Sequence, residues 1–495
     1  MKFRKQDTLS VAMETKSVDT VGSGNDVQPT TLLRPLPAEY TPEYCFERLH
    51  HLPGCVWLDS SMPQAELGRY SYLAVDPFMR LRIDRPHASA VAQLRDYIAP
   101  FEQSKLEGIP PFQGGWMGWL GYELGRSFEN LPRAQHNDFN LPVAALGLYD
   151  LVLSWDHQRE EGWIVSQGFP AQDATARSKR AYRRLKEITQ LLSSKPNRSS
   201  ASHGGYELAN LQLAPQHATR WKNWTSNFAP EHYRSAVERA VEYIHSGDVF
   251  QTNLSQRLLT RATASSPELY MHLRKVSPAP FSGYADFGRI QVISSSPERF
   301  LRLEDGCIET RPIKGTRPRL SDPTADRGMG TLLEVSEKDR SENVMIVDLM
   351  RNDLSRVSDY DSIEVESLCG LEEYPFVWHL VSVVRSKLME ACTTSDVIRC
   401  TFPGGSITGA PKIRAMEIIA ELEPTVRGPY CGSLGYISFA GDMDLSILIR
   451  TITACNGWWQ APVGGGIVAD SKPDLEEQET WHKAEGMLQA IDSLK

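Results

Sequence analysis

A stretch rich in serine, glycine and proline near the middle of the chain most constrains how it can fold. Residues 193–205 read Ser-Ser-Lys-Pro-Asn-Arg-Ser-Ser-Ala-Ser-His-Gly-Gly, a composition typical of linkers. The chain has 495 residues, more than the ~100–200 of one ordinary domain. We therefore predict an N-terminal region over 31–192, a linker over 193–215 and a C-terminal region over 216–495. Residues 1–30 are polar and lack periodicity, which predicts a disordered tail.

Strand-like and helix-like segments alternate irregularly along the chain. Short apolar runs bounded by turn residues indicate strands, and leucines at helical spacing indicate helices. Regular alternation would favour a parallel, doubly wound sheet, so its absence favours an α+β fold. The expected strands are 147–154, 163–166, 291–296 and 299–303, and the expected helices are 176–192 and 230–245.

The composition argues against several classes of protein. The formal net charge of −9 disfavours a nucleic-acid partner, because phosphate contacts need clustered Lys and Arg. No apolar stretch approaches the ~18 residues of a membrane span, and no apolar core follows the N-terminal Met-Lys-Phe-Arg-Lys, so neither a membrane nor a secretory signal is expected. The eight cysteines are scattered without Cys-x-x-Cys spacing, which disfavours zinc and a disulfide framework. We expect reduced thiols in a cytoplasmic protein.

Residues 311–319 read Arg-Pro-Ile-Lys-Gly-Thr-Arg-Pro-Arg and place a lysine among cations. Lysine is a nucleophile only when neutral, which at pH 7 requires its pKa of ~10.4 to fall by about 3 units, equivalent to about 4 kcal/mol. Desolvation would lower the pKa of Lys314, and so would the charges of Arg311, Arg317 and Arg319. The alternative is a basic surface loop in which the lysine is simply solvated.

Two expected helix starts each carry a pair of acids on one face. One pair follows a cap-like Ser336, and the other follows a cap-like Ser471. Like charges three residues apart cost roughly a few tenths of a kcal/mol unless a cation intervenes, and Mg²⁺ prefers such oxygen ligands. The alternative is two solvated helix starts, where acids favour the helix dipole. The pairs are Asp339 with Glu342 and Glu476 with Glu479.

Further positions could meet an anionic or hydroxylated ligand. The run Gly464-Gly-Gly466 could aim several backbone N–H groups at an anion, and Arg450 could bind a carboxylate through two hydrogen bonds. Glu298 lies in a Ser-Ser-Ser-Pro-Glu-Arg-Phe segment and His379 in Val-Trp-His-Leu. In isolation, the glycines are most often a flexible turn, the arginine a surface residue, the glutamate a partner of Arg299 and the histidine structural.

Together these blocks resemble the chorismate-utilising enzymes, which include the anthranilate and aminodeoxychorismate synthases and, more distantly, the isochorismate and salicylate synthases. The resemblance runs with small gaps from about Tyr44 to about Leu494. It implies a two-sheet β core wrapped by helices, with both regions contributing. Most anthranilate synthases carry a small residue at the position of Lys314, whereas a lysine marks the aminodeoxychorismate synthases. These convert chorismate and ammonia to 4-amino-4-deoxychorismate, on the route to 4-aminobenzoate and folate, through a covalent lysine intermediate.

The resemblance also assigns roles to single positions. Lys314 matches the residue that attacks the ring, and Glu298 matches the general acid that protonates the departing 4-hydroxyl. Mg²⁺ would hold one substrate carboxylate and Arg450 the other. The matched magnesium ligands are Glu342, Glu476 and Glu479, with Asp339 nearby, and the matched substrate-binding positions are Gly315, Thr316, Tyr430, Arg450, Gly464, Gly465 and Gly466.

Two other segments belong to the same pocket in this comparison. His379 is a further candidate beside the ring. Residues 403–416 resemble a loop that opens a helix, in which Gly405, Ser406 and Thr408 would shape the pocket floor. This segment is not a Walker P-loop, because Gly-Lys-Ser/Thr is not in register.

Three N-terminal and central segments match a tryptophan pocket of the same family. They read Leu58-Asp-Ser60, Gly68-Arg-Tyr70 and Pro280-Phe-Ser282. In anthranilate synthases this pocket delivers feedback inhibition, and the Leu-Glu-Ser signature of inhibited enzymes reads Leu-Asp-Ser here. This difference weakens the feedback interpretation more than the binding interpretation. The residues expected to bind tryptophan are Ser60, Arg69, Tyr70, Pro280, Phe281 and Ser282.

The sequence contains no Gly-x-Cys-x-Gly elbow, the site of the nucleophile in glutamine amidotransferases. Ammonia would therefore come from solution or from a separate amidotransferase subunit. Two alternatives stay open. The first is the large subunit of an anthranilate synthase, which uses the same pocket and also eliminates pyruvate. The second is a non-catalytic, tryptophan-binding regulatory subunit.

Overall fold

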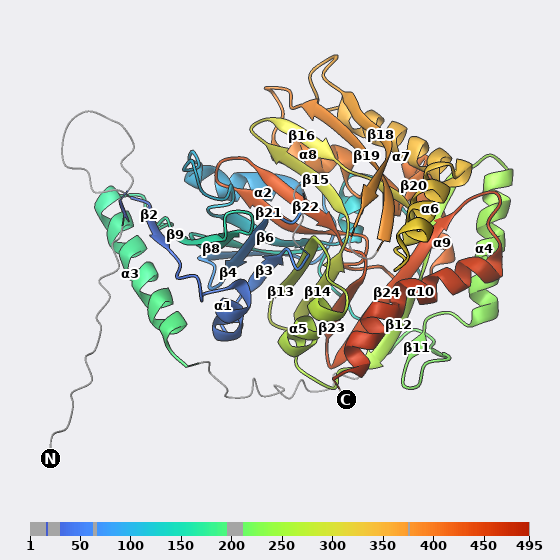
Figure 1. Ribbon diagram of the computed structural model, residues 1–495, viewed down its shortest axis with the longest axis horizontal. Coiled ribbons are helices and arrows are strands. Elements are labelled where there is room, and N and C mark those ends of the chain that lie inside the picture. Colours follow the sequence, from blue (N-terminus) through green and yellow to red (C-terminus); the bar gives the residue numbers. More distant parts are fainter. Residues whose placement is uncertain (1–15, 18–29, 63–66, 196–210, 375–376, 495) are drawn as a thin grey trace.

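Two antiparallel β-sheets form the centre of the molecule, and helices cover them (Figure 1). The predicted α+β class with a two-sheet core is therefore confirmed. The computed structural model describes residues 16–17, 30–62, 67–195, 211–374 and 377–494. The predicted disordered tail lies outside the described residues except at Lys16–Ser17 and Thr30, and so does most of the predicted linker.

The first sheet has fourteen strands and contains both the first strand, β1, and the last strand, β24, of the described chain. Its order is β1 (Lys16–Ser17), β2 (Leu32–Pro35), β9 (Glu161–Ser166), β8 (Leu151–Asp156), β4 (Tyr70–Ala74), β3 (Val56–Asp59), β13 (Phe281–Asp286), β14 (Ile290–Ser296), β23 (Thr451–Cys455), β24 (Trp458–Ile467), β12 (Gln251–Arg261), β11 (Thr225–Ser226) and β10 (His217–Ala218), with β20 (Gly409–Ala410) paired to β12.

The second sheet has ten strands and carries the Lys314 block at one edge. Its order is β17 (Ile313–Pro318), β19 (Val377–Lys387), β16 (Cys307–Thr310), β15 (Arg299–Glu304), β22 (Met443–Ile447), β21 (Ser433–Ser438), β6 (Gly115–Leu120), β7 (Ala144–Tyr149) and β5 (Met79–Ile83), with β18 (Glu364–Glu373) also paired to β19.

The helices place the site residues against these sheets. α7 packs on β17 and β19, and α10 packs on β24. The α-helices are α1 (Pro42–Leu49), α2 (Ala90–Ile98), α3 (Ala174–Ser193), α4 (Pro230–His245), α5 (Ser266–Val276), α6 (Pro323–Glu334), α7 (Glu337–Ser355), α8 (Thr394–Thr401), α9 (Lys412–Leu422) and α10 (Pro473–Asp492), and the 3₁₀ turns are η1 (Ala99–Phe101), η2 (Tyr122–Ser127) and η3 (Gly405–Ile407).

One predicted strand was wrong. The segment 147–154 is two strands, because β7 ends at Tyr149, β8 begins at Leu151, and the two belong to different sheets. The apolar run continues through the crossing, and only the buried Asp150 interrupts it, so the periodicity could not reveal the change of sheet. The other three expected strands and both expected helices are confirmed within a few residues.

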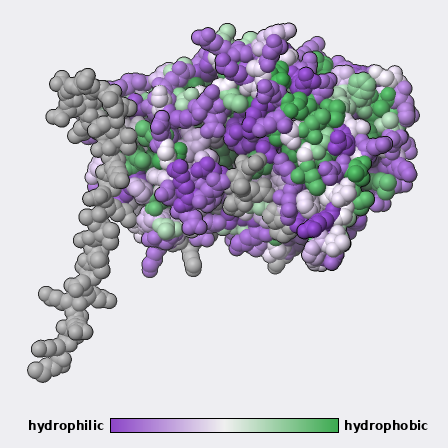
Figure 2. Space-filling view, turned by 45° about the horizontal axis from the view of Figure 1, so that its top comes forward, coloured by the Kyte–Doolittle hydropathy of each residue, from purple (hydrophilic) through white to green (hydrophobic). Residues whose placement is uncertain are grey.

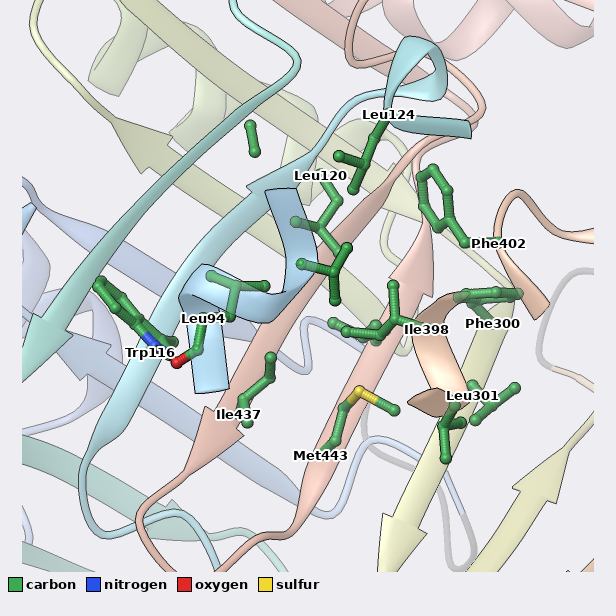
Figure 3. Packing of buried hydrophobic residues seen from close by; sticks show 14 of the residues in the cluster. Leu94, Trp116, Leu120, Leu124, Phe300, Leu301, Ile398, Phe402, Ile437 and Met443 are labelled. Carbon is green, nitrogen blue, oxygen red and sulfur yellow. Dashed lines mark hydrogen bonds between the residues drawn. The ribbon is translucent and has the colours of Figure 1, made fainter. Parts of the chain in front are cut away.

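Strands from before and after the linker pair directly, so the two sequence regions share one core. In the first sheet β3 pairs with β13, and in the second sheet β6 pairs with β21. Figure 3 shows Leu94 and Trp116 from the N-terminal region in the same cluster as Phe300, Ile398 and Met443. Interdigitated cores are dense and tolerate little change in volume. The N-terminal and C-terminal regions therefore pack as one unit.

The surface carries both hydrophilic and hydrophobic groups on the face shown in Figure 2. Exposed aliphatic side chains include Leu332, Val335, Val344 and Leu368, from the end of α6, α7 and β18, with exposed fractions of 44–64%. Among the described residues, none of the helices combines the length and apolar character needed to cross a membrane. All eight cysteines are free thiols.

Candidate active site

Lys314 and Glu298 meet at one residue, Ser406. A bulge interrupts the pairing of β17 with β19 between Ile313 and Thr316, and Lys314 lies within it. Lys314 Nζ donates to the Ser406 carbonyl at 3.5 Å, and Ser406 Oγ donates to Glu298 Oε1 at 2.8 Å. The structure thus brings the predicted nucleophile and the predicted acid into contact with the same residue.

The lowered pKa of Lys314 has a different source from the one expected. Desolvation is its largest cause, and the charge of Lys483 on α10 adds to it, while Glu342 and Glu298 oppose it. The three arginines of the block are instead paired with acids of their own, which corrects the expected source. The alternative of a solvated basic loop does not fit these contacts. The pairs are Arg311–Glu372 at 2.6 Å, Arg317–Asp339 at 3.1 Å and Arg319–Asp326 at 2.7 Å.

Glu298 has the environment of a proton donor. Its exposed fraction is 6%, and burial raises the pKa of its carboxyl to about 7, although Ser406 and Lys314 act in the opposite direction. A carboxyl with such a pKa keeps a substantial protonated fraction near neutrality. The alternative, in which Glu298 only forms an ion pair with Arg299, does not hold. Arg299 instead binds Glu309 and Asp444, each at 3.0 Å.

The three predicted magnesium ligands lie in one neighbourhood. Burial and the charge of Glu479 raise the pKa of both Glu342 and Glu476. Desolvation would also raise the pKa of Glu479, but Lys483, 2.7 Å away, lowers it below its usual value. The donors are carboxylate oxygens, as Mg²⁺ prefers. Within the described ranges, no three acidic, histidine or cysteine side chains converge closely enough to form a metal cluster.

The start of α10 differs from its prediction. Lys472, not Ser471, is the N-cap residue, and Pro473 opens the helix. Ser471 Oγ instead donates to Glu476 Oε1 at 2.6 Å. At α7, by contrast, Ser336 is the N-cap residue as predicted and accepts from the Asp339 N–H. The serine therefore predicted the approximate start of both helices, but it is the N-cap residue only at α7.

The glycine run is a strand, not the flexible turn that glycine runs most often form. Gly464 to Gly466 lie in β24 and pair with β12. A Cβ on Gly465 would lie 3.4 Å from Glu479 Oε1 and 3.6 Å from Glu476 Oε2. A Cβ on Gly466 would lie 3.6 Å from Lys314 Nζ. The missing side chains therefore leave the space between the lysine and the acids open.

Two residues beside the glycine run, Lys483 and Gln251, had not been predicted as part of the site. Lys483 Nζ donates to the Gly464 carbonyl at 2.9 Å and pairs with Glu479, and its spacing of four residues from Glu479 could have revealed it. Gln251 is fully buried, and neither of its amide atoms has a hydrogen-bond partner in the described part of the chain. A Cβ on Gly466 would clash with the Gln251 amide. No sequence pattern distinguishes this glutamine.

A second group of predicted residues lies around His379. Thr316 Oγ1 is 2.9 Å from His379 Nδ1, and burial together with the charge of Arg450 lowers the pKa of His379 to about 4. This imidazole is therefore neutral at pH 7. Arg450 has a pKa lowered by burial, and no ion pair joins it to an acid among the described residues. Gly315, with a φ of +81°, lies between this group and Lys314.

Tyr430 is buried beside Cys431. Its exposed fraction is 4%. Burial raises the pKa of the neighbouring Cys431 thiol to about 12, and the charge of Glu298 adds to this rise. The Arg427 guanidinium lies 5.8 Å from the Tyr430 ring. The predicted substrate-binding positions are thus spread around Lys314 and Glu298.

A separate cavity of about 330 Å³ lies between the two sheets. It is bounded by β3, β4 and β13 of the first sheet and by β15, β21 and β22 of the second. All six residues expected to bind tryptophan line it: Ser60, Arg69, Tyr70, Pro280, Phe281 and Ser282. The cavity has the size of a small-molecule site.

This combination of fold and site defines a chorismate binding enzyme. The sequence pattern of that family matches residues 54–489, so the chain belongs to the family. Aminodeoxychorismate synthase component 1 of Escherichia coli (strain K12) is 40% identical over 470 residues, which cover 91% of this chain and 96% of that protein. Anthranilate synthase component 1 of Streptomyces coelicolor is 38% identical over 439 residues, with 88% and 83% covered.

A solved structure agrees with the sequence relatives. The crystal structure of anthranilate synthase component I from Streptococcus pneumoniae matches with a TM-score of 0.70 at 31% identity, covering 85% of this chain and 92% of that one. Both branches of the family are thus similar to this chain, and the choice between them depends on the site.

Proposed function

We propose that this chain is component 1 of an aminodeoxychorismate synthase, which replaces the 4-hydroxyl of chorismate by an amino group. The observation that carries the proposal is the half-buried Lys314 beside the protonatable Glu298, both in contact with Ser406. The three synthases of this name that resemble the chain at 39–43% identity support it.

The chemistry proceeds in two displacements. Neutral Lys314 forms a bond from Nζ to C2 of the ring, the double-bond electrons shift, and the C4–O bond breaks. Glu298 donates its proton to the departing oxygen, which leaves as water. Ammonia then forms a bond to C4, the electrons shift back, and the C2–N bond to the lysine breaks. Glu298 recovers the proton released by the new amine.

Two charged sites would hold the substrate carboxylates. Glu342, Glu476 and Glu479 do not converge into a ligand cluster in the described structure, so they would have to move together to hold Mg²⁺, and the ion would supply a positive charge to a ring carboxylate. Glu479 would exchange its contact with Lys483 for the ion. Arg450, without an acidic partner in the described chain, would bind the second carboxylate through paired hydrogen bonds.

The amino group would come from a partner. The chain has no amidotransferase elbow, and its relatives are named as components of larger enzymes. We infer a separate glutamine amidotransferase subunit as the source. Purified alone, the chain should aminate chorismate with ammonium salts but not with glutamine, and addition of the partner should confer glutamine use. Efficient glutamine hydrolysis by the isolated chain would contradict this.

The cavity between the sheets would bind tryptophan. Apolar Pro280 and Phe281 lie beside polar Ser60 and Ser282, a mixture suited to a small amphipathic amino acid. The replacement of glutamate by Asp59 favours binding without feedback control. Titration calorimetry with tryptophan tests this.

Anthranilate synthase is the alternative activity, and a regulatory subunit without catalysis is the other. Lys314 speaks against the first, because that branch mostly carries a small residue there. The intact set of Lys314, Glu298 and the acids speaks against the second. An assay with chorismate, Mg²⁺ and ammonium, with products separated by chromatography, should yield aminodeoxychorismate. Accumulation of anthranilate would overturn the assignment, and lack of any product would favour the regulatory subunit.

A further inference from the structure

A buried ion pair behind the catalytic residues has no part in the chemistry described above. Glu423 and Arg427 follow α9, and their side chains are 3% and 2% exposed. Arg427 Nη2 lies 2.7 Å from Glu423 Oε1, and Arg427 Nε lies 2.9 Å from Oε2. Removal of two charges from water costs several kcal/mol per ion and is offset only when further hydrogen bonds satisfy both groups. The remaining partners of the pair therefore indicate what it does.

These partners belong to two segments of the site. Arg427 Nη1 donates to the Ile407 carbonyl and Nη2 to the Asn253 carbonyl, each at 3.0 Å. Glu423 Oε1 accepts from both the N–H and the hydroxyl of Ser255 at 2.8 Å. The pair thus ties the loop 404–408 to strand β12.

The loop and the strand carry the catalytic contacts. Ile407 directly follows Ser406, whose hydroxyl binds Glu298 and whose carbonyl accepts from Lys314. Strand β12 pairs with the glycine run, with Asn253 opposite Gly466. A shift of the Ile407 carbonyl would therefore move Ser406 relative to both reacting groups.

Resting on the proposed function, we propose that Glu423 and Arg427 are a positioning pair. They hold the loop 404–408 so that Ser406 keeps the Glu298 carboxyl and the Lys314 amine at their working separation. Neither member touches a reacting atom. The competing explanation is that the pair only stabilises the fold.

The groups that face the Glu298 carboxyl determine the expected pH effect. They are Ser406 from the loop, Lys314 and the backbone of Ile313 from β17, Lys483 from α10 and the Cys431 thiol. Ser406 and both lysines lower the pKa of Glu298. A displaced loop weakens the Ser406 contact, so the pKa of Glu298 should rise and the acid should remain protonated to higher pH.

The experiment compares Arg427→Lys with Ser406→Ala and with the double variant, using ammonium as the nitrogen source. Lysine at 427 keeps the buried cation but cannot reach both carbonyls. We expect kcat to fall about 10- to 100-fold, the cost of a misplacement of about 1 Å, with KM for chorismate nearly unchanged. The alkaline limb of the kcat profile should move to higher pH in both single variants. The double variant should match Ser406→Ala, because the pair acts through that residue.

The matched control is Arg257→Lys on β12, the strand that the Glu423–Arg427 pair contacts. Arg257 also forms a buried ion pair, 2.6 Å from Asp138 with side chains 5% and 2% exposed, away from the loop. It should lower the thermal midpoint without moving the alkaline limb. If Arg427→Lys behaves in the same way, or if its effect adds to that of Ser406→Ala, the positioning role is wrong. Should Arg427→Lys fail to fold, Glu423→Gln provides the same comparison. The identity of the product, which tests the proposed function, is measured separately in each assay.

Discussion

Glu298 and Arg299 are neighbours in the sequence but lie in two electrostatically different places, the proposed active site and the cavity between the sheets. Glu298 lies at the proposed active site, where burial raises its pKa to about 7 and where no ion pair neutralises it among the described residues. Arg299 lines the cavity between the sheets and is bound by Glu309 and Asp444. The proposed active site therefore contains a carboxyl, Glu298, that is partly protonated near neutral pH, whereas the cavity between the sheets contains a guanidinium, Arg299, that stays charged and paired.

The same contrast extends to other residues of the two sites. In the cavity, Asp59 is bound by Arg274 at 2.8 Å and Arg69 by Asp156 at 2.7 Å. In the catalytic pocket, Arg450 has no acidic partner within the described residues, and burial lowers its pKa. Charge that is desolvated but not neutralised is a feature of reactive sites, and it distinguishes the proposed active site from the cavity between the sheets.

Removal of the nucleophile should have the largest effect. Lys314→Ala should abolish measurable amination while KM for chorismate, or its binding constant, stays within a few-fold, because the lysine acts on the ring and not on the carboxylates. Steady-state kinetics and chorismate titration check this. Wild-type turnover by Lys314→Ala without an added amine would remove the basis of the contrast.

Loss of the proton donor should come next. Glu298→Gln should reduce kcat by about 10²- to 10⁴-fold, the usual contribution of general acid catalysis. In the wild type, the active protonated form disappears as pH rises through about 7, so kcat at saturating ammonia should fall on that limb. A pH profile without this limb would mean that Glu298 is not the donor.

The buried acid should also affect folding. The pKa of Glu298 rises from 4.5 to about 7 on folding, so the folded state binds more protons than the unfolded state between these values. The free energy of unfolding contributed by this group therefore decreases as pH rises across that range. Glu298→Gln removes this pH-dependent loss. The difference in free energy of unfolding between variant and wild type should therefore shift in favour of the variant as pH rises from 5 to 8. Thermal unfolding at both pH values measures it.

The acids of α10 allow a comparison within one helix turn. Glu479→Gln should raise the Mg²⁺ concentration needed for half-maximal activity at least several-fold, because a ligand is lost. Glu477→Gln is the control, since Glu477 is bound by Arg234 at 2.7 Å on α4. Activity should disappear with a chelator and return with Mg²⁺. Full activity in excess chelator would exclude the ion.

The smallest effect on turnover should come from the cavity between the sheets. Phe281→Ala removes an apolar wall, and its ring lies 5.0 Å from the Arg299 guanidinium. Tryptophan should then give a smaller rise in thermal midpoint than in the wild type, because less ligand is bound, while kcat with ammonium changes less than twofold. A large loss of kcat would show that the two cavities are coupled.

Residue type and short spacing indicated a reactive lysine in the Lys314 block and a cation site at the paired acids. The specific roles expected for Lys314, Glu298 and the acids came from the family resemblance, because each motif in isolation had a simpler structural explanation. The expected role of the flanking arginines was wrong, because their acidic partners Glu372, Asp339 and Asp326 lie 7 to 61 residues away along the chain. Such pairings become visible only when β17 meets α6, α7 and β18.

Long-range packing also explains the other differences between prediction and structure. The 147–154 segment passes from one sheet to the other without a turn signal. Gln251 acquires its importance only because β12 pairs with the glycine run of β24. A linker composition suggested two regions, yet the strands on either side pair within both sheets. These features depend on tertiary contacts that no window of sequence contains.

The most direct test of the account is the mass of the protein during a slowed reaction. Chorismate and Mg²⁺ are mixed with the wild type without ammonia, quenched within the turnover time, and examined by intact-protein and peptide mass spectrometry. We expect a transient increase by the mass of chorismate less one water, located on the peptide that contains Lys314 and absent from Lys314→Ala. Absence of the adduct at every time point from a preparation that aminates chorismate once ammonium is added, or an adduct on another residue, would contradict this mechanism.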